Sequence, residues 1–170
     1  NVRCIANVVE GAGFEVIHVI DEPTAAASVL GIRDGAVVDV GGGTTGISIL
    51  KDGKVIFTAD EPTGGTHMTL VLAGYYGISI EEAEKLKTDK DRERDVFPII
   101  KPVVEKMASI VKGFLSGYEV DCVYVVGGAS CFSEFEHTFE KALGIKTVKT
   151  NDALLVTPLG IAWNASAGPV

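Results

Sequence analysis

The sequence has 170 residues, of which 46% are hydrophobic and 22% are charged. This balance is typical of a folded globular domain rather than of a disordered chain. Fifteen Lys and Arg against 23 Asp and Glu give a net charge of −8, which argues against a nucleic-acid binder, because such proteins need a basic surface. An anionic ligand held by backbone amides stays open, since such a site needs no net positive charge.

The mean hydropathy of +0.29 raises the question of a membrane segment, but no apolar run approaches the ~20 residues of a spanning helix. The longest hydrophobic stretch, 97–104, is interrupted by Pro98, Lys101 and Pro102. The chain opens on an amphipathic segment rather than on the apolar core of a signal peptide. Its three cysteines are far apart and have no metal-type spacing. We therefore expect no membrane association, reduced thiols and a cytoplasmic location.

The first third of the chain predicts helix, strand and helix, followed by three strands. Apolar residues at helical spacing predict a helix over 1–13, and the apolar segment 14–20 predicts a buried strand. Asp21-Glu22-Pro23 is typical of a helix start, because proline in the first turn loses no hydrogen bond. Strands are predicted at 36–40, 46–50 and 55–59, the last two joined by the hairpin signal Asp52-Gly53.

The remaining two thirds alternate between helices and strands. Helices are predicted over 64–76 and 80–87, followed by a charged run, 88–95, that we interpret as a solvated loop. A long amphipathic helix follows over 99–115. The last elements predicted are a strand at 122–126, a helix at 132–143, a strand near 146–148 and a helix that begins at Thr157. Together these elements predict an α/β fold with one mixed sheet.

The most informative motif is Asp39-Val40-Gly41-Gly42-Gly43-Thr44-Thr45-Gly46. A strand that ends in an acid and bends through three glycines can bring several backbone amides around one anion. Thr44 and Thr45 add hydroxyl donors, and Asp39 is placed where it could hold a hydrated Mg²⁺. The alternative, a glycine-rich hairpin loop without a ligand, stays open at this point.

Two further glycine pairs follow along the chain. Gly64-Gly65-Thr66 begins a predicted helix, and Gly127-Gly128-Ala129 ends a predicted strand. A tight turn would explain either pair by itself. Three glycine motifs in this order favour a nucleotide site, because loops at the strand ends on one side of a sheet are where such folds bind nucleotides.

With these motifs the sequence resembles the actin, hexokinase and DnaK-type chaperone superfamily of ATPases. Residues 39–44 resemble its second phosphate loop and residues 126–129 its adenosine loop. Residues 21–27 are similar to the segment that leads into the crossover helix of DnaK-type chaperones. The match spans almost the whole chain. Within the superfamily, the sequence resembles the EutJ family of ethanolamine utilization proteins, which are short DnaK-like proteins without a peptide-binding domain.

The resemblance implies a ribonuclease H-like mixed sheet with flanking helices, the second half of an actin-like two-domain ATPase. Residues 1–31 would form the end of the preceding actin-like domain and the crossover helix. Residues 32–170 would form the second domain, with a helical insert near 60–95. We therefore expect the chain to be the C-terminal portion of a longer protein, whose other half supplies the first phosphate loop and a catalytic lysine.

The resemblance also implies roles for particular residues. Glu22 and Asp39 would line the Mg²⁺ and the attacking water, with Asp39 acting through metal-bound waters and Thr44 as a third catalytic residue. Phosphates, ribose and adenine would be bound by a larger set, comprising Gly41, Gly42, Gly43, Thr44, Thr45, Gly64, Gly65, Glu84, Lys87, Gly127, Gly128 and Ala129. Within this set Glu84 and Lys87 would grip the ribose and adenine.

Three positions depart from the pattern of DnaK-type chaperones. Gly46 stands where they carry an acidic residue after the phosphate loop. Ala129 and Cys131 replace a serine and an arginine that touch the base, so that weaker adenine binding is expected.

The function implied is that of an ATP- and Mg²⁺-binding, ATP-hydrolysing protein of chaperone type whose nucleotide state regulates a protein partner. That partner would be an ethanolamine-catabolism enzyme or a component of a bacterial microcompartment, with which the protein would associate. One alternative is a nucleotide-gated scaffold or filament-forming protein without turnover. Another is a small-metabolite kinase, although residues 60–120 offer no candidate for its general-base aspartate.

Overall fold

The sheet is the centre of the fold. A computed structural model describes residues 2–167 and contains a five-stranded mixed sheet with the order β3-β2-β1-β4-β5. Three strands form an antiparallel meander, β1 (Gly35–Val40), β2 (Thr45–Lys51) and β3 (Lys54–Glu61). On the other side of β1, β4 (Cys122–Val126) and then β5 (Lys146–Lys149) run parallel to it. The mixed α/β class predicted from the sequence is thus confirmed.

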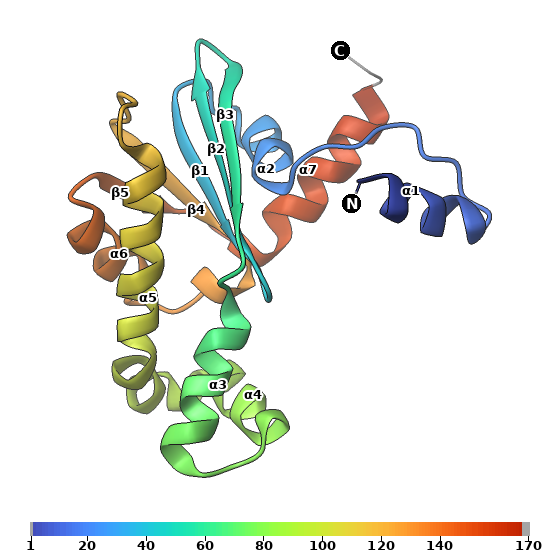
Figure 1. Cartoon of the computed structure of the whole chain (residues 1–170). Coiled ribbons are helices and arrows are strands. Elements are labelled where there is room, and N and C mark those ends of the chain that lie inside the picture. The colour runs from blue at the N-terminus through green and yellow to red at the C-terminus, as the bar shows by residue number, and fades with distance from the viewer. Residues whose placement is uncertain (1, 168–170) are drawn as a thin grey trace.

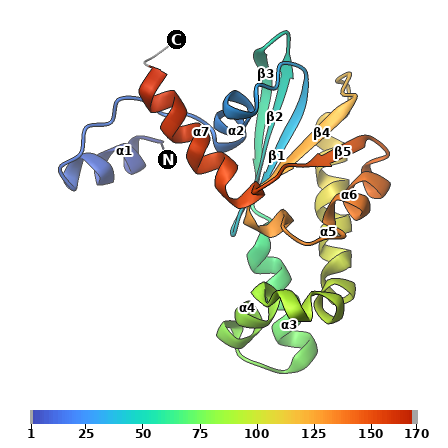
Figure 2. The ribbon, with the colours of Figure 1, turned by 180° about the vertical axis from the view of Figure 1, so that it is seen from behind.

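Helices cover both faces of the sheet. The helical elements are α1 (Val2–Gly11), α2 (Glu22–Leu30), α3 (Gly65–Tyr76), α4 (Ile80–Thr88), η1 (Lys90–Arg92), α5 (Glu93–Leu115), η2 (Gly128–Ser130), α6 (Phe135–Leu143) and α7 (Ala153–Ala167). Figures 1 and 2 show α5 and α6 on one face of the sheet and α2 and α7 on the other, with α3 and α4 forming a lobe beyond the sheet end. Within residues 2–167, no helix combines the length and apolar character needed to cross a bilayer.

Alternation along β1 divides the core between the two faces. Val38 and Val40 belong to the large apolar cluster with α5 and α6, whereas Val37 packs with α2 and α7. Successive side chains of a strand point to opposite faces, so Asp39 shares the α2 and α7 face with Val37. The strand therefore delivers one carboxylate to the end of the sheet beside the first turn of α2.

The segment 14–20 contradicts the prediction of a buried strand. It has no strand pairing, and Phe14 and Ile17 are 69% and 63% exposed. A strand needs neighbours to satisfy its backbone and to cover its apolar side chains, and the sheet lies elsewhere (Figure 1). The segment is therefore a connection without helix or strand between α1 and α2. The described residues do not include residue 1 or residues 168–170, which lie at the ends of the predicted units 1–31 and 32–170.

Two helices begin earlier than predicted. The charged run 88–95 is exposed apart from half-buried Glu93, as its composition predicts, but it is not a loop, because it contains η1 and α5 begins at Glu93. Pro98 is accommodated inside α5 because it is exposed, so water can satisfy the carbonyl group that loses its helical partner. Likewise α7 begins at Ala153 rather than at Thr157 and contains Pro158.

The helices α2 and α7 cross with their backbones in contact. A Cβ added at Gly160 of α7 would overlap the carbonyl oxygen of Ala25 in α2, whose side chain is fully buried. The crossing therefore requires glycine at position 160. By contrast, a Cβ added at Gly113 of α5 meets nothing within 4 Å.

We expect Gly160→Ala to lower the free energy of unfolding by about 1–3 kcal/mol, because the helices must separate to admit the methyl group. Gly113→Ala is the matched control and should raise it by about 0.5–1 kcal/mol, as alanine does in helix interiors. Urea unfolding followed by circular dichroism measures both. Equal effects of the two substitutions would contradict the close crossing.

Candidate functional site

The glycine loop between β1 and β2 is held by the N-terminus of α3. The loop itself is a tight hairpin in which the amide of Gly41 donates to the carbonyl of Thr44 at 2.9 Å. The first amides of α3, from Gly65 and Thr66, donate to the carbonyl oxygens of Gly41 and Gly42 at 2.9 and 2.7 Å. These two hydrogen bonds fix the orientation of two successive peptide groups in the loop.

The orientation of these peptides turns two amides outward. In a trans peptide the C=O and N–H groups point in opposite directions. Since the carbonyls of Gly41 and Gly42 point to α3, the N–H groups of Gly42 and Gly43 point away from it, and both glycines are exposed. Adjacent amides that face the same way form an anion-binding concavity. The loop is thus a hairpin whose geometry fits an anion.

Gly64 allows α3 to approach the loop this closely. A Cβ added at Gly64 would lie 2.7 Å from the carbonyl oxygens of Gly41 and Gly42, so no other residue fits without displacing the loop. The amide of Gly64 donates to Nδ1 of His67 at 3.2 Å. The hydroxyl of buried Thr45 donates to the carbonyl of Thr63 at 2.6 Å, so its side chain anchors the loop.

Asp39 lies at the C-terminal end of β1, is 4% exposed and is clamped on two sides. Its Oδ2 accepts a hydrogen bond from the hydroxyl of Thr157 in α7. Its Oδ1 lies over Gly127, where a Cβ would overlap it and where φ is +91°. Burial raises the pKa of Asp39, and the Thr157 hydrogen bond counteracts that rise.

Two further carboxylates lie near Asp39. Strand pairing places Asp39, Gly46 and Asp60 in one row across β1, β2 and β3, and paired residues share a face of the sheet. Asp60 Oδ1 lies 3.9 Å from the position of a Cβ on Gly46. Burial, and then repulsion from Asp39 and Asp60, raise the pKa of Glu22 in the first turn of α2. Three carboxylates therefore converge beside the glycine loop.

Among residues 2–167, no three His, Cys, Asp or Glu side chains lie close enough to hold a metal ion directly. Carboxylate oxygens are the donors that Mg²⁺ prefers, and Mg²⁺ usually keeps several of its waters. The three carboxylates thus fit a hydrated Mg²⁺ better than a directly ligated metal ion.

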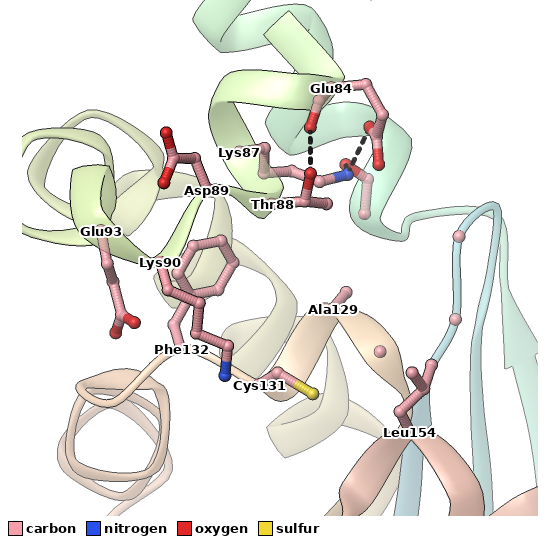
Figure 3. A pocket seen from close by; sticks show the side chains of 14 residues that line it. Glu84, Lys87, Thr88, Asp89, Lys90, Glu93, Ala129, Cys131, Phe132 and Leu154 are labelled. Carbon is pink, nitrogen blue, oxygen red and sulfur yellow. Dashed lines mark hydrogen bonds and ion pairs between the residues drawn. The ribbon is translucent and has the colours of Figure 1, made fainter.

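A pocket of about 420 Å³ opens on the other side of the glycine loop. It brings together seven of the predicted nucleotide-binding residues, Gly41, Gly42, Gly65, Glu84, Lys87, Gly128 and Ala129. Figure 3 shows the side chains of α4 on one side of the pocket and those of η2 and α7 on the other. Gly43, Thr44, Thr45, Gly64 and Gly127 are not among the lining residues. Gly43 and Thr44 lie between β1 and β2, Thr45 begins β2, and Gly64 and Gly127 directly precede α3 and η2.

The predicted pair of Glu84 and Lys87 forms part of a network that the sequence did not show. The ammonium group of Lys87 donates to Glu84 at 2.7 Å, to the hydroxyl of Thr69 at 2.8 Å and to the carbonyl of Gly65 at 3.1 Å. The Thr69 hydroxyl in turn donates to Glu84 at 2.5 Å. Although burial opposes it, hydrogen bonds from Lys87 and Thr69 lower the pKa of Glu84. The pair is therefore preorganised at the pocket wall.

Sequence reasoning missed Asp60, Thr69 and Thr157. The four-residue spacing from Gly65 to Thr69 on a helix gave a weak signal for Thr69. Nothing in the local sequence indicated the contact between Thr157 and Asp39, because 118 residues separate them.

The fold has close counterparts among solved structures. The crystal structure of ethanolamine utilization protein EutJ from Carboxydothermus hydrogenoformans is similar with a TM-score of 0.87 and 52% identity, over 92% of this chain and 59% of that chain. The structure of MreB5 of Spiroplasma citri bound to ADP shares the fold, with a TM-score of 0.81 and 17% identity over 97% of this chain and 64% of that one. The chain thus has the fold of an actin-like ATPase domain.

At the level of sequence, the model of the family described as type IV pilus assembly protein PilM matches residues 27–156, and the chain belongs to this family. The chain is also 44% identical over 166 residues to the ethanolamine utilization protein EutJ of Salmonella typhimurium (strain LT2), which covers 97% of this chain and 59% of that protein. The chain therefore spans about three-fifths of the length of this curated relative. The predicted resemblance to the actin and DnaK-type superfamily and to EutJ is confirmed.

We expect Gly64→Ala to loosen the glycine loop, because the added methyl group must displace the loop carbonyls. Amide hydrogen exchange of residues 41–44 should accelerate, and the free energy of unfolding should fall by about 1–3 kcal/mol. Gly74→Ala is the control within the same helix, since its Cβ meets nothing within 4 Å. Unchanged exchange in the Gly64 variant would refute the contact.

We expect Asp39→Asn to stabilise the fold at about pH 8 and to lose that advantage toward about pH 4. Burial raises the pKa of Asp39 in the folded state. The ionised carboxylate therefore lowers stability above this raised pKa, whereas the protonated group has no such cost. Asparagine is neutral and can still accept the Thr157 hydrogen bond. Urea unfolding at both pH values measures the difference, and a less stable variant at pH 8 would contradict the account.

Proposed function

We propose that the chain is the nucleotide-binding second half of an actin-like ATPase that binds and hydrolyses Mg²⁺-ATP. The observation that carries the proposal is the pair of outward-facing amides at Gly42 and Gly43, fixed beside the carboxylates of Glu22 and Asp39. The ADP bound to MreB5 in its crystal structure supports the proposal, because that protein shares the fold.

The pocket and the loop suggest how ATP would lie. The adenosine would occupy the pocket, with its ribose at Glu84 and Lys87 and the backbone of Gly128 and Ala129 beneath it. The phosphates would then reach the amides of Gly42 and Gly43. Ala129 and Cys131 present a small side chain and a thiol to the base, so this end of the pocket would contribute less affinity than the phosphate end.

The carboxylates would carry out the chemistry of the site. A bound Mg²⁺ would neutralise charge on the phosphates. Asp39 would face this ion through its waters, and Glu22 would orient the attacking water and accept its proton. The raised pKa of Glu22 suits a general base, because proton transfer is most efficient when the pKa of the base approaches the working pH. Thr44 would complete the loop around the terminal phosphate.

We infer that residues 1–31 form the end of a preceding domain and the crossover helix, which is α2, and that residues 32–170 form the second domain, with the helical lobe near 60–95 as its insert. Apolar side chains on α1 support this division, because Val2, Ile5 and Val8 are at least 59% exposed and α1 lies apart from the sheet (Figure 1). The cleft between the two domains would close on the nucleotide.

We further propose a chaperone-like role in which the nucleotide state regulates a protein partner. The names of the relatives support an assembly or ethanolamine utilization context. The partner would be an enzyme of ethanolamine catabolism or a component of a microcompartment in the cytoplasm. A second candidate function is a nucleotide-gated scaffold without turnover. It is favoured by Gly46, which places no acid on β2 beside the loop.

The full-length protein should release phosphate from ATP, and Asp39→Asn should lower kcat about 100-fold or more, as expected when electrostatic stabilisation of a transition state is lost. Asp52→Asn is the control, since Asp52 lies in the hairpin at the opposite end of β2. ATP binding is measured in parallel by calorimetry. Binding without turnover would favour the scaffold, and an absence of binding in the wild type would refute the nucleotide site.

A further inference from the structure

Thr157 makes the one hydrogen bond to the Asp39 side chain that the structure records among residues 2–167. Both side chains are buried, Asp39 at 4% and Thr157 at 8% exposure. The hydroxyl donates to Oδ2 while Oδ1 lies over Gly127, so the plane of the carboxylate is set by one donor and one backbone contact. A valine would fill the same volume as Thr157 but could not donate.

The position of Thr157 on α7 links it to two other parts of the site. Leu154, Thr157 and Gly160 are spaced three residues apart and therefore lie along one side of the helix. Leu154 lines the pocket and packs on Gly128, with 3.0 Å between its Cδ1 and a Cβ built there. Gly160 packs against the backbone of Ala25. One side of α7 thus contacts the pocket, Asp39 and α2.

The N-terminal end of α7 is also held in place, by a backbone hydrogen bond. The amide of Gly127 donates to the carbonyl of Ala153 at 2.9 Å, so the first residue of the helix is tied to the strand end that supports Asp39. With α7 held at Ala153 and at Gly160, Thr157 between them has little freedom to move. A donor on a fixed helix can hold a carboxylate in one orientation, which a donor on a loop could not do as well.

We infer that Thr157 is a positioning residue that holds the Asp39 carboxylate in the orientation needed to face the hydrated divalent cation of bound nucleotide. The inference rests on the proposed function. The hydroxyl donor of Thr157, rather than the volume of its side chain, is what orients Asp39. Within the described part of the chain, the Thr157 hydroxyl is the one donor that fixes Oδ2, and without it the contact of Oδ1 with Gly127 alone would have to set the plane of the carboxylate. Because Leu154 on the same side of α7 lines the pocket, α7 connects the Asp39 carboxylate to the pocket in which the nucleotide would bind.

The test is the affinity of the full-length protein for ADP, measured by calorimetry with Mg²⁺ and again with EDTA. The ratio of the ADP affinity with Mg²⁺ to the ADP affinity in EDTA should be about tenfold smaller for Thr157→Val than for the wild type. This is the effect expected when a hydrogen bond to a charged group is removed. Affinity in EDTA should stay unchanged. Thr157→Ser keeps the hydroxyl donor and should retain the Mg²⁺ gain. Thr157→Ala gives a second variant without the donor in case the valine variant is unstable.

Thr138→Val is the matched control, because Thr138 is a buried threonine of α6 on the opposite face of the sheet. A purely structural role would lower the affinity in EDTA and the affinity with Mg²⁺ together. That result would overturn the inference, as would an undiminished Mg²⁺ gain in the valine variant or an equal loss in the serine variant. If the wild type binds no ADP under either condition, the proposed function itself fails.

Discussion

The site depends on the two hydrogen bonds that the first amides of α3 donate to the carbonyls of Gly41 and Gly42. They turn the next two amides outward and require glycine at position 64. Gly65 then links both ends of the site, because its amide holds Gly41 while its carbonyl accepts from Lys87 at the pocket wall. The glycine loop and the pocket therefore form one connected unit, and a shift of α3 would disturb both.

The ionised carboxylates beside this unit lower the free energy of unfolding. Burial raises the pKa of both Glu22 and Asp39, and repulsion from Asp39 and Asp60 adds to the rise at Glu22. Ionising either carboxylate therefore has a cost in folding stability. Residues that conflict with stability in this way cluster at functional sites, where the charge serves a ligand. The close seat of α7 on α2 and the clamp of Thr157 and Gly127 around Asp39 hold the acidic cluster in place.

Sequence reasoning identified the mixed sheet and the glycine loops, because alternation and glycine clusters are local signals. It missed Asp60 because of the register between β2 and β3. The Asp52-Gly53 turn pairs Lys51 with Lys54, and an unbroken register from this pair would place Ala59 opposite Gly46. An irregularity between Ile49 and Leu50 shifts the register, so that Gly46 pairs with Asp60. One such slip moves a side chain to the other face of a sheet. The prediction for segment 14–20 failed for a different reason. Its composition favours a strand, but whether a strand forms depends on a neighbouring strand, which the local sequence does not show.

The most direct test of the account is a crystal structure of the full-length protein with ADP and Mg²⁺. We expect phosphate oxygens within hydrogen-bond distance of the Gly42 and Gly43 amides, the ribose at Glu84 and Lys87, and a hydrated cation facing Asp39. A nucleotide bound elsewhere, or phosphates that contact α3 rather than the loop amides, would contradict it.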